Sequence, residues 1–72
     1  MKKFTIRDLA TDREYTNTIE NLVEFVNNNN DTSAEDYEID TWCYNQNPTF
    51  KLWLSHRGYT FNRCGQIIKE VA

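Results

Sequence analysis

The stretch "KLWLSHRGYTFNR", residues 51–63, decides the predicted fold because alternating apolar residues precede a connection that contains glycine. Leu52 and Leu54 are two positions apart, which is the spacing of side chains on one face of a strand. We therefore predict that "TFKLWL", residues 49–54, is a strand with both leucines in the core. Trp53 is then expected on the outward face of that strand.

The rest of this stretch predicts a corner between two elements. "SHRG", residues 55–58, can form a four-residue connection because Gly58 tolerates a positive φ angle. "YTF", residues 59–61, then predicts a short strand. Asn62 follows as a residue that can cap the N-terminus of a helix.

The C-terminal segment shows helical spacing. Its apolar residues recur at i, i+3, i+4 and i+7, at Cys64, Ile67, Ile68 and Val71. This period is typical of an amphipathic helix with one buried side. We therefore predict a final helix that begins after Asn62 and buries Cys64.

The N-terminal part predicts a hairpin followed by a helix. "FTIRDL" alternates in polarity and "EYTNT" can return beside it, so residues 3–16 are expected to form two antiparallel strands. The next apolar residues again have helical spacing, at Ile19, Leu22, Val23 and Val26. A helix over residues 18–28 is predicted, with Asn17 as its cap and Glu20 reaching back to it.

The central segment is harder to assign. "NNNNDTSAED" is expected to be a loop that can contain a short helical turn, with Ser33 as cap and Asp36 three residues later. "YEIDTWCYN", residues 37–45, is compatible with a strand or a helix. We favour a strand because β-branched and aromatic residues dominate it, and Trp42 and Tyr44 then share one side.

Together these elements predict an α+β fold in one domain, residues 1–72. Its small antiparallel sheet consists of two hairpins, and two amphipathic helices pack on one face, in the order β-β-α-β-β-(β)-α. Seventy-two residues are too few for two domains, which rarely fall below about 50 residues each.

The composition argues against several classes of protein. Two cysteines are fewer than a secreted disulfide scaffold normally carries, so we expect reduced thiols and a cytoplasmic location. The basic start "MKKFTIRDLA" lacks the apolar run of a signal peptide. No apolar stretch is long enough to predict a membrane span.

Charge is distributed unevenly along the chain, whose formal net charge is −3. Residues 14–50 contain eight acidic residues and no Lys or Arg, whereas residues 1–13 and 51–72 are each net positive. This segregation favours partners of opposite charge on different faces, if folding keeps the segments apart. A solvated acidic surface without a partner is the simpler alternative.

Catalytic and metal-binding patterns are weak, so we expect no enzyme activity, no cofactor and no metal. His56 is the only histidine, and the adjacent Ser55 side chain should diverge from it. Cys43, His56 and Cys64 have no zinc-ligand spacing. The acidic loop lacks the glycine and final glutamate of a calcium-binding loop, and there is no glycine-rich phosphate loop.

The favoured function is a protein-interaction module. Exposed tryptophan and tyrosine often carry binding energy at interfaces, so an outward aromatic face is expected to bind a protein partner or a second copy of this chain. The acidic segment is the second part of that interface. The predicted interface residues are Trp42, Tyr44, Trp53, Glu35, Asp36, Glu38 and Asp40. Size and composition suit an accessory or inhibitory factor, as encoded by phages or mobile elements.

The alternative function is weak binding of single-stranded nucleic acid through residues 51–63. Aromatic rings can stack on bases while cations follow the phosphates. The residues predicted for this role are Lys51, Trp53, Arg57, Tyr59 and Arg63. Overall acidity disfavours a polyanionic partner.

One short motif within that stretch has a known counterpart. "RGYTF", residues 57–61, resembles the start of the RNA-recognition-motif signature, in which aromatics on a sheet stack on bases. Thr60 stands where that signature has a small Gly or Ala. The chain also offers no strand after its last predicted helix, which that fold needs, so we do not assign the family.

Overall fold

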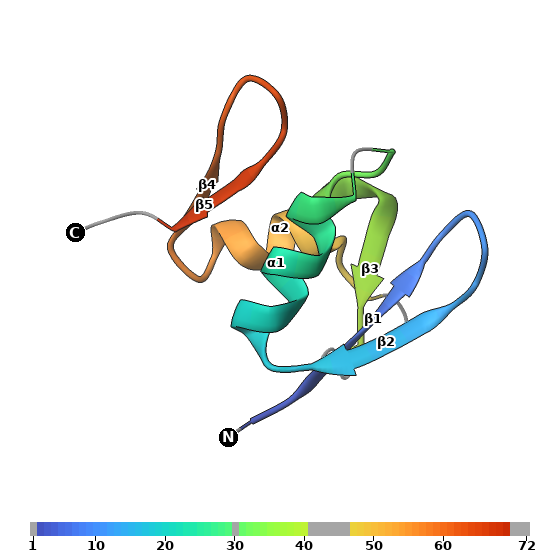
Figure 1. The fold of residues 1–72 in the computed structure, drawn as a ribbon. Coiled ribbons are helices and arrows are strands. Elements are labelled where there is room, and N and C mark those ends of the chain that lie inside the picture. Colours follow the sequence, from blue (N-terminus) through green and yellow to red (C-terminus); the bar gives the residue numbers. More distant parts are fainter. Residues whose placement is uncertain (1, 30, 41–46, 70–72) are drawn as a thin grey trace.

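The computed structural model describes residues 2–29, 31–40 and 47–69, and its fold is α+β (Figure 1). Strands β1 (Phe4–Asp8), β2 (Glu14–Asn17) and β3 (Tyr37–Ile39) form an antiparallel sheet in the order β2-β1-β3. Strands β4 (Tyr59–Phe61) and β5 (Ile67–Lys69) form a second antiparallel pair. The α+β class is confirmed, but two elements differ from the sequence prediction.

The N-terminal hairpin is confirmed, with Ile6 opposite Tyr15 in the ladder between β1 and β2. Its turn is built around Asp8, whose carboxylate accepts a hydrogen bond from the backbone N–H of Ala10 at 2.8 Å. The backbone N–H of Asp12 donates to the carbonyl of Asp8, and Asp12 has a φ of 62°. Short acidic side chains tolerate this left-handed conformation, so the turn forms without glycine.

Helix α1 (Ile19–Asn28) is also confirmed, and it begins one residue later than expected. Thr18 is its N-cap, because the Thr18 hydroxyl accepts from the backbone N–H of Asn21. Asn17 supports this cap from outside by accepting from the Thr18 N–H at 2.8 Å. The assignment of Asn17 as the cap itself was therefore wrong by one position.

The central segment contains the short helical turn that the sequence suggested. It is the 3-10 helix η1 (Ala34–Asp36), and the Asp36 carboxylate accepts from the backbone N–H of Ser33 at 2.8 Å. Strand β3 follows directly and confirms the extended conformation for its three residues. Trp42, Cys43 and Tyr44 lie outside the described residues.

The predicted strand at residues 49–54 is wrong, because the chain forms helix α2 (Phe50–Ser55) there. The Thr49 hydroxyl caps this helix by accepting from the backbone N–H of Leu52 at 3.1 Å. Phe50, Trp53 and Leu54 are buried, which is the i, i+3, i+4 pattern of a helix. Leu52 was expected in the core but is 52% exposed.

The predicted final helix is wrong as well, because residues 59–69 form the hairpin of β4 and β5. Asn62 accepts backbone hydrogen bonds as expected, but from Cys64 and Gln66 within a turn. Gly65 has a φ of +83°, a conformation that ends any continuous helix at this point. Cys64 is consequently exposed rather than buried.

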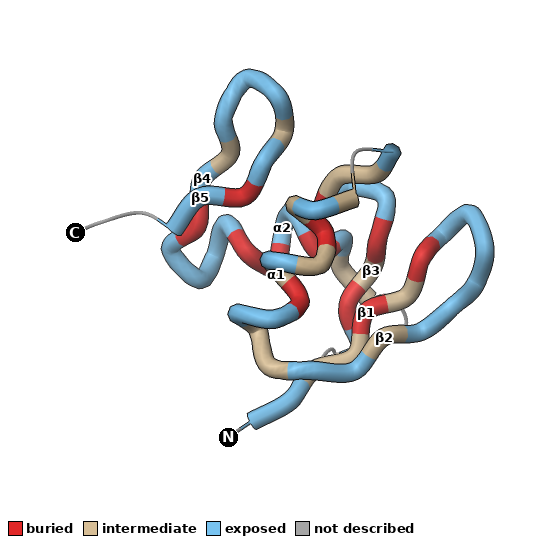
Figure 2. Tube along the Cα trace, viewed as in Figure 1, coloured by how far each residue is buried: buried red, intermediate tan, exposed pale blue. Residues whose placement is uncertain are grey.

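One hydrophobic core connects these elements (Figure 2). Its largest fully buried side chains come from β1, α1, β3 and α2, and Tyr59 and Ile67 extend it to the sheet of β4 and β5. Helix α2 contacts both β3 and β4, so it links the two sheets. The expected arrangement, with both helices on one face of a single sheet, is therefore replaced by two sheets that share a helical centre (Figure 1).

Candidate anion-binding site

Trp53 lies inside the protein, contrary to the predicted outward orientation. Its side chain is on the buried side of α2, and the residue is only 6% exposed. The ring of Phe4 contacts it edge-on at 4.9 Å between centroids, and the ring of Phe50 is stacked at 6.1 Å. Because a helix replaces the predicted strand, the outward aromatic face loses this tryptophan.

Arg57 covers the outer side of this aromatic group. It follows α2 in a turn, where its backbone N–H donates to the carbonyl of Leu54 at 2.9 Å. Its guanidinium carbon lies 4.5 Å from the centroid of the Trp53 ring and 5.7 Å from that of Phe4. Cation–π attraction to two rings positions the guanidinium at the surface.

Two lysines from the start of the chain join Arg57. Lys2 Nζ lies 5.6 Å from the centroid of the Phe4 ring, and Lys3 is the next residue along the approach to β1. A hollow of about 450 Å³ lies between these side chains. We call it the basic pocket, and its main lining residues are Lys2, Lys3, Phe4, Asp40, Trp53 and Arg57.

The basic pocket has an excess of positive charge. Its described lining includes three cations and one carboxylate, that of Asp40. Within residues 2–29, 31–40 and 47–69, the ion pairs involve Arg7 and Lys51 but none of the three pocket cations. Lys2, Lys3 and Arg57 are all exposed, so their charges are available to an anion from solution.

The predicted acidic interface is largely engaged within the chain. Glu38 forms an ion pair and a hydrogen bond with Arg7, and these two interactions raise the pKa of the Arg7 guanidinium. Glu35 lies 3.8 Å from Lys51 Nζ, and Asp36 accepts the backbone hydrogen bond at the start of η1. Asp40 belongs instead to the basic pocket.

The residues predicted for nucleic-acid binding are divided between two places. Arg57 lies in the basic pocket, whereas Lys51 and Arg63 line a second hollow of about 230 Å³. Lys51 Nζ is 5.4 Å from the Phe61 ring centroid. Tyr59 is only 8% exposed, like Trp53, so the two aromatics expected to stack on bases are buried.

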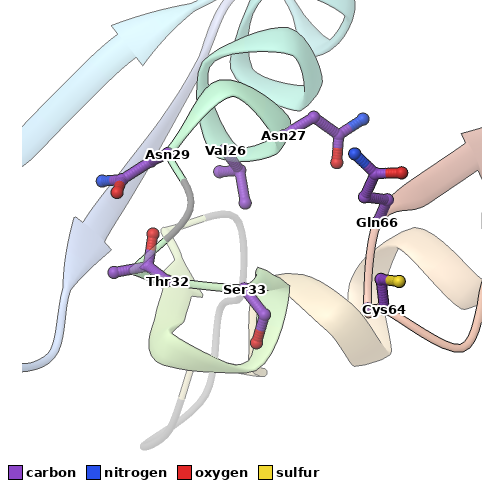
Figure 3. A pocket seen from close by; sticks show the side chains of 8 residues that line it. Val26, Asn27, Asn29, Thr32, Ser33, Cys64 and Gln66 are labelled. Atoms are coloured by element: carbon purple, nitrogen blue, oxygen red, sulfur yellow. The ribbon is translucent and has the colours of Figure 1, made fainter.

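A third hollow separates the end of α1 from the turn between β4 and β5 (Figure 3). Its volume is about 350 Å³, and its polar lining is uncharged, with side chains of Asn27, Asn29, Thr32, Ser33, Cys64 and Gln66. Asn27 is already engaged: its amide donates to the carbonyl of Ile67 at 3.0 Å and accepts from the Ile67 N–H at 2.8 Å. The structure thus uses this polar cluster in part to attach β5 to α1.

Groups that could perform catalysis are dispersed in the part of the chain that the structure describes. The Ser55 hydroxyl donates to the carbonyl of Leu52 at 2.7 Å, and no hydrogen bond there joins His56 to a serine or cysteine side chain. Among the same residues, no three metal-ligating side chains form a cluster. None of the helices described has the length and apolar composition to cross a membrane.

Sequence reasoning named Arg57, Trp53 and Asp40 as site residues but missed the pocket residues at the start of the chain. Lys2, Lys3 and Phe4 are about fifty positions away from Arg57 in the sequence, and no motif connects the two segments. The only signal was the shared positive charge of residues 1–13 and 51–72. That signal showed that these segments could form a basic surface together, but not which residues would meet.

Comparison with known proteins adds no family. No family model matches this chain, and neither the curated proteins nor the solved structures contain a significant match.

Proposed function

We propose that this protein is a non-enzymatic interaction module that binds an anionic segment of a protein partner in the basic pocket. One observation carries the proposal: among the described residues, three exposed cations line a hollow to which Asp40 alone adds a carboxylate. The like charges of these side chains repel one another, and a bound anion would relieve this repulsion. An accessory or inhibitory role, in which the protein acts by binding and not by catalysis, fits the dispersal of catalytic groups within the described residues.

The aromatic rings support binding by holding one cation in place. Arg57 lies against Trp53 and Phe4, so less side-chain entropy is lost when its guanidinium engages a ligand. Arginine also presents several N–H donors in one plane, which match the two oxygens of a carboxylate. A positioned arginine beside two lysines is thus suited to an acidic peptide.

A fluorescence titration tests this proposal directly. Trp53 lines the pocket and reports on binding there, and a Trp42→Phe background removes the only other tryptophan signal. The probe is an oligoglutamate peptide, with oligoglutamine of equal length as the uncharged comparison. We expect saturable binding of the acidic peptide only, weakening as salt rises from about 50 to about 200 mM because exposed charges are screened.

Matched variants locate the site. Arg57→Gln and Lys3→Gln should each weaken binding several-fold, whereas Arg63→Gln removes an exposed arginine outside the basic pocket and should leave binding unchanged. Absence of saturable binding, or equal losses in all three variants, would overturn the proposal.

A further inference from the structure

The charge of the basic pocket matches a particular kind of anion. The three cations and Asp40 in the described part of its lining sum to an excess of two positive charges. A single carboxylate supplies one negative charge, whereas a phosphate monoester carries about −1.5 to −2 at neutral pH. A phosphate group therefore neutralises the pocket more completely than one acidic side chain does.

The donors of the pocket also suit a phosphate. Arg57 is exposed, and within the described residues its guanidinium lies over the rings of Trp53 and Phe4 and takes part in no ion pair. Arginine binds phosphate oxygens through two parallel hydrogen bonds, and lysine adds a mobile point charge. Arg57 lines the hollow from the turn after α2, and Lys2 and Lys3 line it from the start of the chain, so a phosphate there would lie among cations of two segments.

The aromatic residues argue against nucleic acid as the source of that phosphate. Binding of single strands relies on exposed rings on which bases stack. Trp53 is 6% exposed, Tyr59 is 8% exposed, and the Phe4 ring is half-buried with Lys2 and Arg57 over it. Among the described residues, the pocket thus offers charge for a phosphate but no exposed ring on which a base could stack.

We infer that the basic pocket recognises a phosphorylated side chain on a protein partner, with Lys2, Lys3 and Arg57 contacting the phosphate oxygens. This inference rests on the proposed function and narrows it from acidic segments in general to one phosphomonoester. Binding is noncovalent, and no phosphate is transferred or cleaved.

The experiment compares three capped alanine pentapeptides with a central phosphoserine, glutamate or serine. In the Trp42→Phe background, the phosphoserine peptide should bind at least about tenfold more tightly than the glutamate peptide, because Coulomb attraction grows with ligand charge. The serine peptide should not bind. Arg57→Gln and Lys3→Gln should reduce this preference, and Arg63→Gln should preserve it. The ring contacts that the described residues make with Trp53 involve Phe4, Phe50 and Arg57 and not Lys3, so Lys3→Gln keeps the test valid if Arg57→Gln fails to fold.

A pH profile separates phosphate recognition from general acidity. The second pKa of phosphoserine is about 6, so lowering the pH from about 7.5 to about 5.5 should weaken its binding about fourfold as the dianion is lost. The charged groups that face the ligand are Lys2, Lys3, Arg57 and Asp40. His56 precedes Arg57 in the sequence and is not among the described lining residues of the pocket. The glutamate peptide remains ionised over this range.

The outcomes distinguish the two proposals. If glutamate and phosphoserine peptides bind equally, the phosphate inference fails while the proposed function stands. If neither peptide nor oligoglutamate binds, both fail. If a 5′-phosphorylated oligothymidylate binds more tightly than the phosphopeptide and competes with it, the partner is a nucleic acid and the inference is overturned.

Discussion

Asn27 joins two parts of the chain that are 40 positions apart, through hydrogen bonds to both backbone groups of Ile67. Both bonds are partly buried, so removing the amide leaves backbone groups without a partner. We expect Asn27→Ala to lower the free energy of unfolding by about 1–3 kcal/mol. Urea denaturation followed by circular dichroism measures this change.

Asn28 provides the matched control for that prediction. It is the next residue of α1 and is exposed, so Asn28→Ala should change stability by less than about 0.5 kcal/mol. Equal losses in the two variants would show that helix propensity, and not the contact with Ile67, determines the effect.

Tyr59 makes the stability depend on alkaline pH. Burial, and secondarily the charge of Glu20, raise the pKa of the Tyr59 phenol above its usual value near 10.0. The folded chain therefore holds this proton more tightly than the unfolded chain. Its contribution is complete below about pH 10 and is lost as the pH rises toward the pKa of the folded state.

The variant Tyr59→Phe tests this dependence because it keeps the buried ring and removes the proton. Between about pH 8 and about pH 11, the wild-type unfolding free energy should fall more steeply than that of the variant, by at most about 1.4 kcal/mol per pH unit. Urea midpoints across this range provide the comparison. Parallel curves would contradict the role of Tyr59.

At the scale of elements, the sequence predicted α1 and the first hairpin well because each has one consistent period. Residues 50–54 are different, since Phe50 and Leu54 fit both a strand and a helix. The helix forms because Thr49 caps it and because burying Trp53 requires the i, i+3 spacing. Local alternation could not reveal that Trp53 packs against Phe4 from the distant β1.

Two leucines distinguish these alternatives in solution. A strand would place Leu52 and Leu54 on one buried face, whereas α2 exposes Leu52 and buries Leu54 completely. We expect Leu54→Ala to cost about 2–5 kcal/mol and Leu52→Ala less than about 0.5 kcal/mol. Thermal or urea unfolding measures both. Similar large losses would support the strand and contradict the helix.

The predicted helix in the C-terminal segment was wrong for a related reason. Ile67 and Ile68 have helical spacing with Cys64. A hairpin forms nevertheless, because Asn62 and Gly65 build the turn that connects β4 to β5. Asn62 was recognised as a residue that accepts backbone hydrogen bonds, but the same chemistry serves a helix cap and a turn. The position of Asn62 three residues before Gly65 was the signal in the sequence that favours a turn over a helix cap.

At the scale of the molecule, the core predicts cooperative unfolding. It includes residues of both sheets and both helices, and the Cα radius of gyration of 11.5 Å is close to the ~11 Å expected for a compact chain of this length. Trp53 fluorescence in the Trp42→Phe background and far-ultraviolet circular dichroism should therefore report the same urea midpoint. Separate midpoints would indicate that the two sheets unfold independently.

The basic pocket also exists only at this scale. Its cations come from segments that the sequence marked as positive, but their meeting depends on α2 bringing Arg57 against Phe4. The predicted outward aromatic face was wrong for Trp53, because this residue lies on the buried side of α2. The other two predicted members, Trp42 and Tyr44, lie outside the described residues. Tertiary packing therefore determined the site more than any motif did.

The contact between Asn27 and Ile67 has a consequence for association between copies. Gln66 faces Asn62 in the hairpin, so alternation along β5 directs the Ile67 backbone groups away from β4, where an incoming chain could extend the sheet. The Asn27 amide occupies both groups, as a neighbouring strand would. A strand of another copy could add to this edge of β5 only after displacing the Asn27 side chain. Helix α1 therefore protects the hairpin from edge-to-edge association.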